Sequence, residues 1–231
     1  QRFFDMIQLD AALQNLPVRF CMDRAGLSPD DGPTHHGLFD IAMIRSIPNI
    51  VFMQPKDEAE FVHMLRTMNH YQNGPTVIRY PRGCGAGTPV PAKAEILPIG
   101  KAEVLQAGQD VTLVSLGTMI GIARETASLL EARGYTVTLI NARFIKPLDD
   151  ECIRRHAARS RVVCTFEDHS ISGGFNSAVL ESLETGDVKT PVEAIAWPDQ
   201  FIEHGSESIL RKKYGLTAEA ALQKIIPHLN S

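Results

Sequence analysis

The densest group of polar side chains lies at residues 30–37, where two aspartates, a threonine and two histidines follow one another closely. The group comes shortly after an apolar run at residues 18–22 and a turn that contains Arg24. In an open α/β sheet, ligands bind outside the carboxyl ends of the strands, so this loop is a plausible site. Its carboxylate, imidazole and guanidinium groups suit proton transfer and anion binding. The alternative is a solvated turn in which Asp, Gly and Pro serve the backbone geometry.

A metal site in this loop has little support. Asp31 and His35 are of the right chemical type for ligands. Residues so close in sequence rarely converge on one point, however, and no third ligand follows at a helpful spacing. We therefore predict no metal ligand among these side chains.

The second polar cluster reads Arg79-Tyr80-Pro81-Arg82-Gly83 and begins where an apolar strand should end. Planar guanidinium groups bind phosphate in bidentate fashion, so two arginines beside glycine suit a phosphorylated ligand. The alternative is a basic strand end that faces water. The glycines that follow do not form G-x-G-x-x-G and open no helix, which gives little evidence for a nucleotide.

Several weaker features follow strands in the second half of the chain. The turn at residues 115–118 could bind an anion at a helix N-terminus, although a plain turn is the more common case. The polar groups at residues 167–169 and 204–205 and the lone Trp197 are expected to serve structure.

The elements that position these residues alternate between strands and helices. In the first half we predict strands at 18–22, 50–53 and 76–80 and helices at 2–14, 38–46 and 57–70. Asp57 should cap the last helix, with Glu60 as its capping-box partner. In the second half we predict strands at 101–106, 111–116, 136–141, 161–166 and 192–196, and helices at 119–133, 150–159, 174–185, 206–213 and 217–228.

This alternation predicts an α/β protein with two domains, each built on a mainly parallel sheet flanked by helices. Glycines and prolines dominate residues 81–98 and break any regular element. We place one domain at residues 1–88, a linker at 89–98 and a second domain at 99–231.

Composition narrows the function. The chain has 231 residues, 44% hydrophobic and 22% charged, with a net charge of −4. These values are ordinary for a globular protein and give no support to a nucleic-acid or membrane-surface partner. The four cysteines show no C-x-x-C spacing, which favours reduced thiols and a cytoplasmic location. The chain begins without Met, and helical spacing begins at once, at Phe3, Phe4 and Ile7, so we expect it to have been cut from a longer protein.

A set of motifs distributed over the whole chain resembles one family. They read Asp-Arg-Ala-Gly at 23–26, Asp-Gly-Pro-Thr-His at 31–35, Thr-His-His-Gly-x-Phe-Asp at 34–40, Ile-Pro-Asn at 47–49, Arg-Tyr-Pro-Arg-Gly at 79–83, Leu-Pro-Ile-Gly-Lys at 97–101 and Arg-Phe-Ile-Lys-Pro-Leu-Asp at 143–149. This set resembles the 1-deoxy-D-xylulose-5-phosphate synthases, a family of transketolase-type thiamine-diphosphate enzymes, more than transketolase itself or pyruvate-dehydrogenase-type β subunits.

The resemblance implies a C-terminal part of such an enzyme: a pyrimidine-binding domain without its N-terminal portion, then a transketolase C-terminal domain. The family's reaction condenses pyruvate with D-glyceraldehyde 3-phosphate and releases CO₂, for isoprenoid, thiamine and pyridoxal precursors. Thiamine diphosphate and Mg²⁺ would be held mainly by the missing N-terminal domain, so the chain alone should be an incomplete catalyst. A homodimer is implied as well.

By the same resemblance, Arg24 and Arg82 bind the acceptor phosphate. Asp31 and His35 act as the catalytic pair at the oxygens where the new bond forms, and Arg2 lies near the aminopyrimidine edge of the cofactor. Arg79 and His36 match the motifs but carry no defined role.

Two other interpretations remain open. The chain could be a half or β-type subunit of a split transketolase or 2-oxo acid dehydrogenase that needs a partner chain. It could also be a plain α/β binding module, which predicts no thiamine-dependent activity with any partner.

Overall fold

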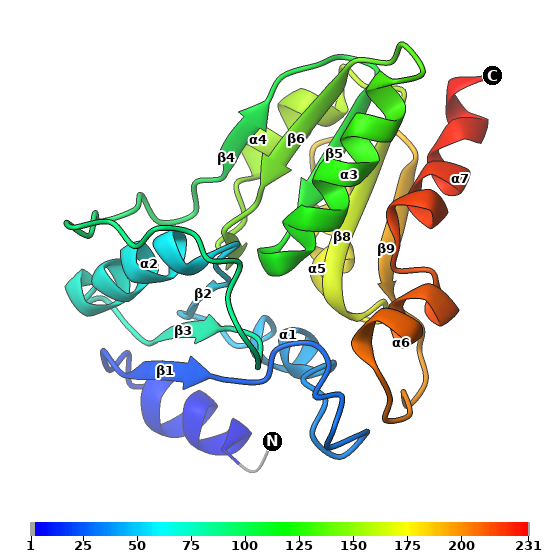
Figure 1. Cartoon of the computed structure of the whole chain (residues 1–231). Helices are drawn as coiled ribbons and strands as arrows, with labels where there is room; N and C mark the ends of the chain where they lie inside the picture. The colour runs from blue at the N-terminus through cyan, green and yellow to red at the C-terminus, as the bar shows by residue number, and fades with distance from the viewer. Residues whose placement is uncertain (1–2, 231) are drawn as a thin grey trace.

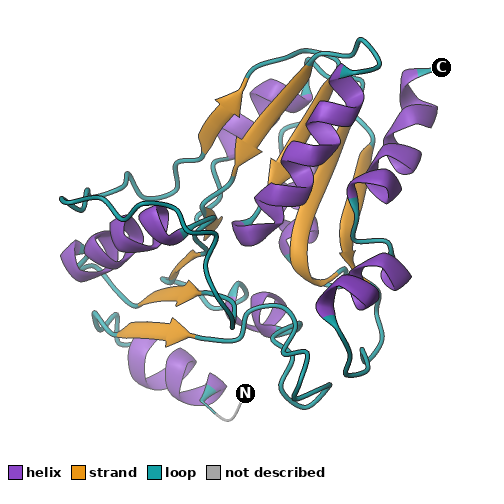
Figure 2. Cartoon of the chain, in the orientation of Figure 1, coloured by secondary structure: helices purple, strands orange, loops and turns teal. Residues whose placement is uncertain are grey.

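Two sheets organise residues 3–230, the part of the chain that the computed structural model describes (Figures 1 and 2). The first sheet has the order β1-β3-β2-β7, and β1, β2 and β3 run parallel. The second has the order β4-β6-β5-β8-β9, in which only the edge strand β4 runs antiparallel to its neighbour. The mainly parallel α/β architecture predicted from the sequence is confirmed. The strands are β1 Arg19–Met22, β2 Val51–Met53, β3 Thr76–Arg79, β4 Glu103–Gln106, β5 Val111–Ser115, β6 Val137–Asn141, β7 Phe144–Lys146, β8 Val162–Ser170 and β9 Val192–Trp197.

Helices cover both faces of each sheet, which explains why the central strands read as continuous apolar runs. On the first sheet, η1 and α1 pack on one face and α2 on the other. On the second, α3 and α7 lie together on one face and α4 and α5 on the other (Figure 1). The helices are η1 Met6–Ala12, a π-helix, α1 Asp40–Ile44, α2 Glu58–His70, η2 Gly117–Met119, a 3₁₀ turn, α3 Ile120–Glu131, α4 Asp150–Ala157, α5 Phe175–Thr185, α6 Glu207–Tyr214 and α7 Ala218–Leu229. None of the helices between residues 3 and 230 is long and apolar enough to cross a membrane.

The two halves of the chain share one hydrophobic core. The cluster that contains Phe52 and Val77 of the first sheet continues into Val114 and Ile140 of the second, and all four side chains are fully buried. Burial on this scale is the main favourable term in folding, so the relative position of the two sheets is fixed by packing.

Strand β7 was not predicted. Its three residues follow β6 in the second half of the chain, yet β7 pairs antiparallel with β2 of the first sheet. Three residues are too few for a periodic signal, and the pairing partner lies about ninety residues away in sequence. The strand therefore reaches from one half into the sheet of the other.

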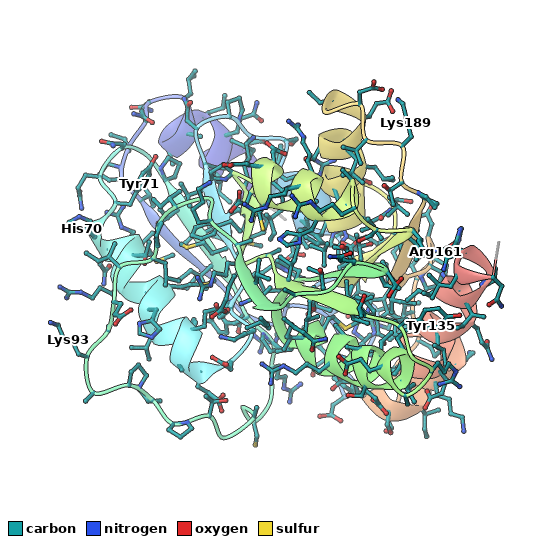
Figure 3. All side chains as sticks on the ribbon, turned by 90° about the horizontal axis from the view of Figure 1, so that it is seen from above. His70, Tyr71, Lys93, Tyr135, Arg161 and Lys189 are labelled. Carbon is teal, nitrogen blue, oxygen red and sulfur yellow. The ribbon has the colours of Figure 1, made fainter. Side chains whose placement is uncertain are left out.

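The linker between the sheets runs across the outer side of α2. Viewed from above, Lys93 lies on the same side of the molecule as His70 near the end of that helix (Figure 3). The Leu97 backbone N–H donates to the Thr67 hydroxyl at 2.8 Å, and that of Glu95 donates to His63 Nδ1 at 2.8 Å. These bonds attach a segment that has no helix or strand of its own.

The N-cap of α2 is where the sequence placed it. Asp57 Oδ1 accepts a hydrogen bond from the Glu60 N–H at 2.8 Å, which satisfies one free donor of the first turn. The Glu60 carboxylate, expected to bond back to the cap residue, instead accepts from the Lys56 N–H at 2.8 Å.

Replacing Asp57 by Ala should remove this cap and lower the free energy of unfolding by about 1 kcal/mol. Asp57→Asn keeps an acceptor oxygen and should stay within a few tenths of a kcal/mol of the unmodified chain, on the order of normal Asp–Asn cap differences. Urea unfolding of both variants makes the measurement. Equal losses would show that charge, and not the cap, is responsible.

Candidate functional site

The two polar clusters predicted from the sequence meet at the carboxyl ends of β1 and β3. These strands pair in register with Met22 opposite Arg79, so the segments that follow them leave the sheet side by side. The Tyr80 N–H donates to the Met22 carbonyl at 3.0 Å, and the Ala25 N–H donates to the Tyr80 carbonyl at 2.9 Å. Parallel strands present their carboxyl ends at one edge, and this edge is where ligands bind in such sheets.

The segment after β1 forms a closed loop. The Gly26 N–H donates to the Gly37 carbonyl at 3.1 Å, and the Gly37 N–H donates back to the Gly26 carbonyl at 2.8 Å. Gly26 has φ +76°, which favours glycine. A Cβ on Gly37 would lie 2.2 Å from the Arg24 carbonyl oxygen, so only glycine fits there. We call these two residues the neck and residues 27–36 the substrate loop, after the role that the motif resemblance implies for Asp31 and His35.

The substrate loop and its surroundings present the predicted polar groups to solvent. Asp31 and His35 are exposed, and Arg82 Nη1 lies 2.5 Å from Asp31 Oδ2. Within residues 3–230 the His35 side chain hydrogen-bonds only the Thr34 hydroxyl, at 2.9 Å from Nδ1. Arg24 forms an ion pair with Asp23, and its backbone has φ +60°. The structure therefore brings Asp31 and Arg82 together and leaves His35 free to meet a ligand.

His36, in contrast, is buried and holds the loop in place. Its Nδ1 accepts from the Ser28 N–H at 2.9 Å, and its Nε2 lies 3.3 Å from the Glu203 carbonyl, to which it donates. The Gly205 N–H also donates to the Pro29 carbonyl at 3.2 Å. The segment after β9, in the second half of the chain, therefore supports the tip of the substrate loop.

Arg79 lies beneath the neck and is completely buried. Its guanidinium donates to Asp40 Oδ2 at 2.9 Å, to the Gly37 carbonyl at 2.9 Å, and to Gln54 Oε1 and Asp168 Oδ1 at 2.5 Å each. Burial disfavours the charge of Arg79, but the carboxylates of Asp168 and Asp40 outweigh it and raise the arginine pKa. The motif resemblance singled out Arg79 without a role, and the structure gives it four acceptors from distant parts of the chain.

Asp168 belongs to a row of buried titratable groups in β8, which runs four residues beyond its predicted end. Burial raises the pKa of Asp168, but Arg79 outweighs burial and the net shift is downward. Burial also raises the pKa of Glu167 to about 8, although both its oxygens accept N–H groups from the start of α5. Burial lowers the pKa of His169, whose Nδ1 donates to the Ser170 carbonyl at 2.7 Å. These side chains lie inside the strand and not at a solvated end.

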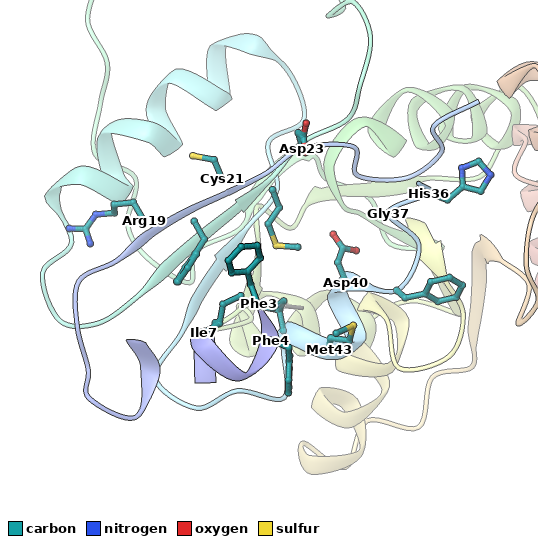
Figure 4. Close-up of a pocket in the computed structure, with 14 residues that line it drawn as sticks. Phe3, Phe4, Ile7, Arg19, Cys21, Asp23, His36, Gly37, Asp40 and Met43 are labelled. Carbon is teal, nitrogen blue, oxygen red and sulfur yellow. The ribbon is translucent and has the colours of Figure 1, made fainter. Parts of the chain in front are cut away.

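A pocket of about 530 Å³ opens beside the neck, between η1, β1 and α1 (Figure 4). Its walls are mostly apolar, and Asp23, Asp40 and His36 reach its edge. Such a pocket, apolar with few polar groups, suits a flat organic ring. The apolar lining residues are Phe3, Phe4, Ile7, Phe20, Met22, Phe39, Met43 and Ile44.

The other predictions from the sequence concern Arg2, the turn at 115–118, Trp197 and a metal site. Arg2 lies outside the described residues. The turn at 115–118 is covered by Gln54, since a Cβ on Gly117 would lie 2.2 Å from the Gln54 amide nitrogen. Trp197 is buried against Tyr214, with ring centroids 5.9 Å apart. Within residues 3–230 no three His, Cys, Asp or Glu side chains gather in a way that could hold a metal ion.

Sequence reasoning missed the partners of Arg79. Asp40, Gln54 and Asp168 lie at separate places in the chain, and no spacing connects them. For Gln54 and Asp168 the available signal was a position just after a predicted strand, and for Asp40 it was the motif at 34–40.

Comparisons with known proteins identify the family of the chain. The chain matches the transketolase pyrimidine-binding domain over residues 1–86 and the transketolase C-terminal domain over residues 100–220. A 1-deoxy-D-xylulose-5-phosphate synthase of Acidobacterium capsulatum is 52% identical over 99% of the chain and 36% of its own length. One of Methylacidiphilum infernorum is 50% identical over the whole chain and 37% of its own length. These relatives confirm the resemblance drawn from the motifs, and the chain spans little more than a third of their length.

Among solved structures, a split-gene transketolase described as an inactive β4 tetramer has a TM-score of 0.88. It is 30% identical in sequence, and the match covers 99% of this chain and 72% of that one.

The buried Glu167 should make the free energy of unfolding depend on pH. Its folded pKa of about 8 exceeds the ordinary value of 4.5, so the folded state holds a proton that the unfolded chain releases. The stabilisation is complete below pH 4.5 and is lost as pH rises toward 8. The free energy of unfolding should therefore fall across this range with a slope of about one proton, relative to Glu167→Gln. Urea unfolding at several pH values measures this, and equal slopes in both proteins would contradict it.

Proposed function

Because the chain belongs to the transketolase family, we propose that it forms the acceptor-binding part of a 1-deoxy-D-xylulose-5-phosphate synthase. The proposed reaction condenses pyruvate with D-glyceraldehyde 3-phosphate and releases CO₂. The observation that carries this proposal is the substrate loop, in which Asp31 and His35 stand exposed at a strand edge beside Arg82. Relatives that are about half identical over the aligned residues carry the name of this synthase.

The cofactor of this family is thiamine diphosphate, whose thiazolium ring supplies the electron sink for decarboxylation when bound. The apolar pocket beside the neck fits the flat aminopyrimidine end of that molecule, with Phe20 and Met22 in its wall. We expect Arg2 near the edge of the ring. The proposal assigns the diphosphate and its Mg²⁺ mainly to another part of the complete enzyme.

Arg82 and Arg24 are proposed to bind the acceptor phosphate. Both side chains are about two-fifths exposed and lie on the segments that leave β3 and β1 together. Each is neutralised by a neighbouring aspartate, Asp31 and Asp23 respectively. An incoming phosphate would compete for these guanidinium groups, which are suited to bidentate contacts with oxyanions.

Asp31 and His35 are proposed to manage the proton at the acceptor carbonyl. When the new carbon–carbon bond forms, the aldehyde oxygen becomes a hydroxyl, so a proton must reach it. An imidazole can supply one near neutral pH. Release of Asp31 from Arg82 by the phosphate would leave its carboxylate available to orient the imidazole.

The second candidate function is that of a transketolase-type subunit that works with a partner chain. The fold match with a split-gene transketolase favours it. A homodimer and a cytoplasmic location remain expectations of the family, and the chain's cysteines are free. Product analysis of the unmodified enzyme with pyruvate and D-glyceraldehyde 3-phosphate separates the candidates, because only a synthase joins pyruvate to the phosphorylated aldehyde.

In the complete enzyme, Arg82→Ala should lower kcat/KM for D-glyceraldehyde 3-phosphate by about ten- to a hundredfold, since a charged hydrogen bond contributes about 1.5–3 kcal/mol. Pyruvate decarboxylation should change little. Arg24→Ala should behave alike. Steady-state kinetics with each substrate varied make the measurement, with Arg66→Ala, on α2, as a control for loss of surface charge. An unchanged acceptor dependence would refute the phosphate assignment.

His35→Ala should slow carboligation by roughly 10²–10⁴-fold, the usual scale for general acid–base help. The melting temperature should hold, because His35 is exposed and its side chain hydrogen-bonds only the neighbouring Thr34 within residues 3–230. His36→Ala serves as the contrast: it removes a buried brace and should lower the melting temperature. If His35→Ala melts early and loses every step equally, His35 is a structural residue.

A further inference from the structure

The buried guanidinium of Arg79 bonds to the same atom that closes the substrate loop. The Gly37 carbonyl accepts from Arg79 Nη2 at 2.9 Å and from the Gly26 N–H at 3.1 Å. Asp168 accepts from Nη1 of the same guanidinium and also lies against Gly26, since a Cβ there would lie 3.0 Å from Asp168 Oδ2. Both sides of the neck therefore rest on one ion pair.

We propose that Arg79, held by Asp168, is a positioning residue that sets where the substrate loop presents Asp31 and His35. The proposal rests on the proposed function, in which those two groups handle the acceptor. Arg79 touches no reacting atom and acts through the neck.

The ion pair joins the two halves of the chain at this point. Arg79 ends β3 of the first sheet, and Asp168 lies in β8 of the second. The loop tip is tied to the second half as well, through the bonds of His36 and Pro29 to residues 203 and 205. The second half therefore holds the substrate loop at its neck and at its tip.

Stability alone is a weak reason for this arrangement. Desolvation of a buried ion pair offsets much of its attraction, and apolar residues of similar volume are often as stabilising. What apolar residues cannot supply is a fixed direction. A planar fork with five N–H donors fixes the angle between Gly37, Asp40 and Asp168, and a lysine ammonium cannot span all of them.

The test uses the complete enzyme with Arg79→Lys and Asp168→Asn. Both should lower kcat/KM for the phosphorylated acceptor by about a hundredfold, the scale for a misplacement of about 1 Å. Pyruvate decarboxylation should fall less than acceptor use in either variant. Partial recovery in Arg79→Lys relative to Arg79→Met is expected, because lysine keeps the charge.

The matched control is Arg143→Met. Arg143, in the second half, also binds the first half through Glu60 at 2.7 Å, and it binds Glu103 of its own half at 3.0 Å, but neither carboxylate lies in the substrate loop. Arg143→Met should lower the melting temperature without a selective fall in kcat/KM for the phosphorylated acceptor. If kcat/KM for the acceptor falls in every variant in proportion to the fall in melting temperature, Arg79 is only a structural residue.

Hydrogen exchange of backbone amides gives a second measurement that is independent of activity. Residues 27–37 should exchange faster in Arg79→Lys and Asp168→Asn than in Arg143→Met, and the core strands should not. Unchanged exchange in this segment would overturn the positioning role.

If Arg79→Lys fails to fold, Asp168→Asn and Asp40→Asn decide the matter. A wild-type enzyme that makes no product from pyruvate and the aldehyde would refute the proposed function, while exchange would still test the positioning role.

Discussion

The buried guanidinium of Arg79 is the constraint on which the arrangement of the site depends. A charge with no access to water must have its donors satisfied, or it would cost several kcal/mol, on the order of the whole stability of a domain. Its acceptors come from α1, from the neck, from the segment after β2 and from β8. These four segments can approach one point only when both sheets are formed and packed together. The charge therefore couples local order at the strand ends to the assembly of the whole chain.

This coupling fixes the position of side chains that are themselves exposed. Asp31, His35 and Arg82 all face solvent, and exposed ion pairs contribute little to stability. Their position is set instead by the neck below and by the buried His36 beside them, which contacts residue 203 in the second half. In many α/β proteins the binding groups lie on loops, and a rigid scaffold holds those loops in position. Here the scaffold includes both halves of the chain, so the second half contributes to the site without presenting a reactive group.

Sequence reasoning named the polar groups of the proposed site but not the residues that support them. Strand–helix alternation and the Asp57 cap are local signals, which fix the elements to within a few residues. The proposed site residues were visible because polar motifs follow apolar strands. Strand β7 and the extension of β8 escaped because pairing with a distant strand, and not local pattern, stabilises them. The partners of Arg79 escaped for the same reason, since Gln54 and Asp168 become neighbours only after the sheets pack.

The contrast between Glu167 and Asp168 shows why Asp168 suits the anchoring position. The two are adjacent in β8 and equally buried, yet their pKa values move in opposite directions. Glu167 accepts two N–H groups at the start of α5, and these partial charges do not offset the cost of burial. Asp168 faces a full positive charge on Arg79 at hydrogen-bond distance, which does offset it. A carboxylate that stays ionised near neutral pH keeps Arg79 paired, so the neck of the substrate loop keeps its anchor while neighbouring groups titrate.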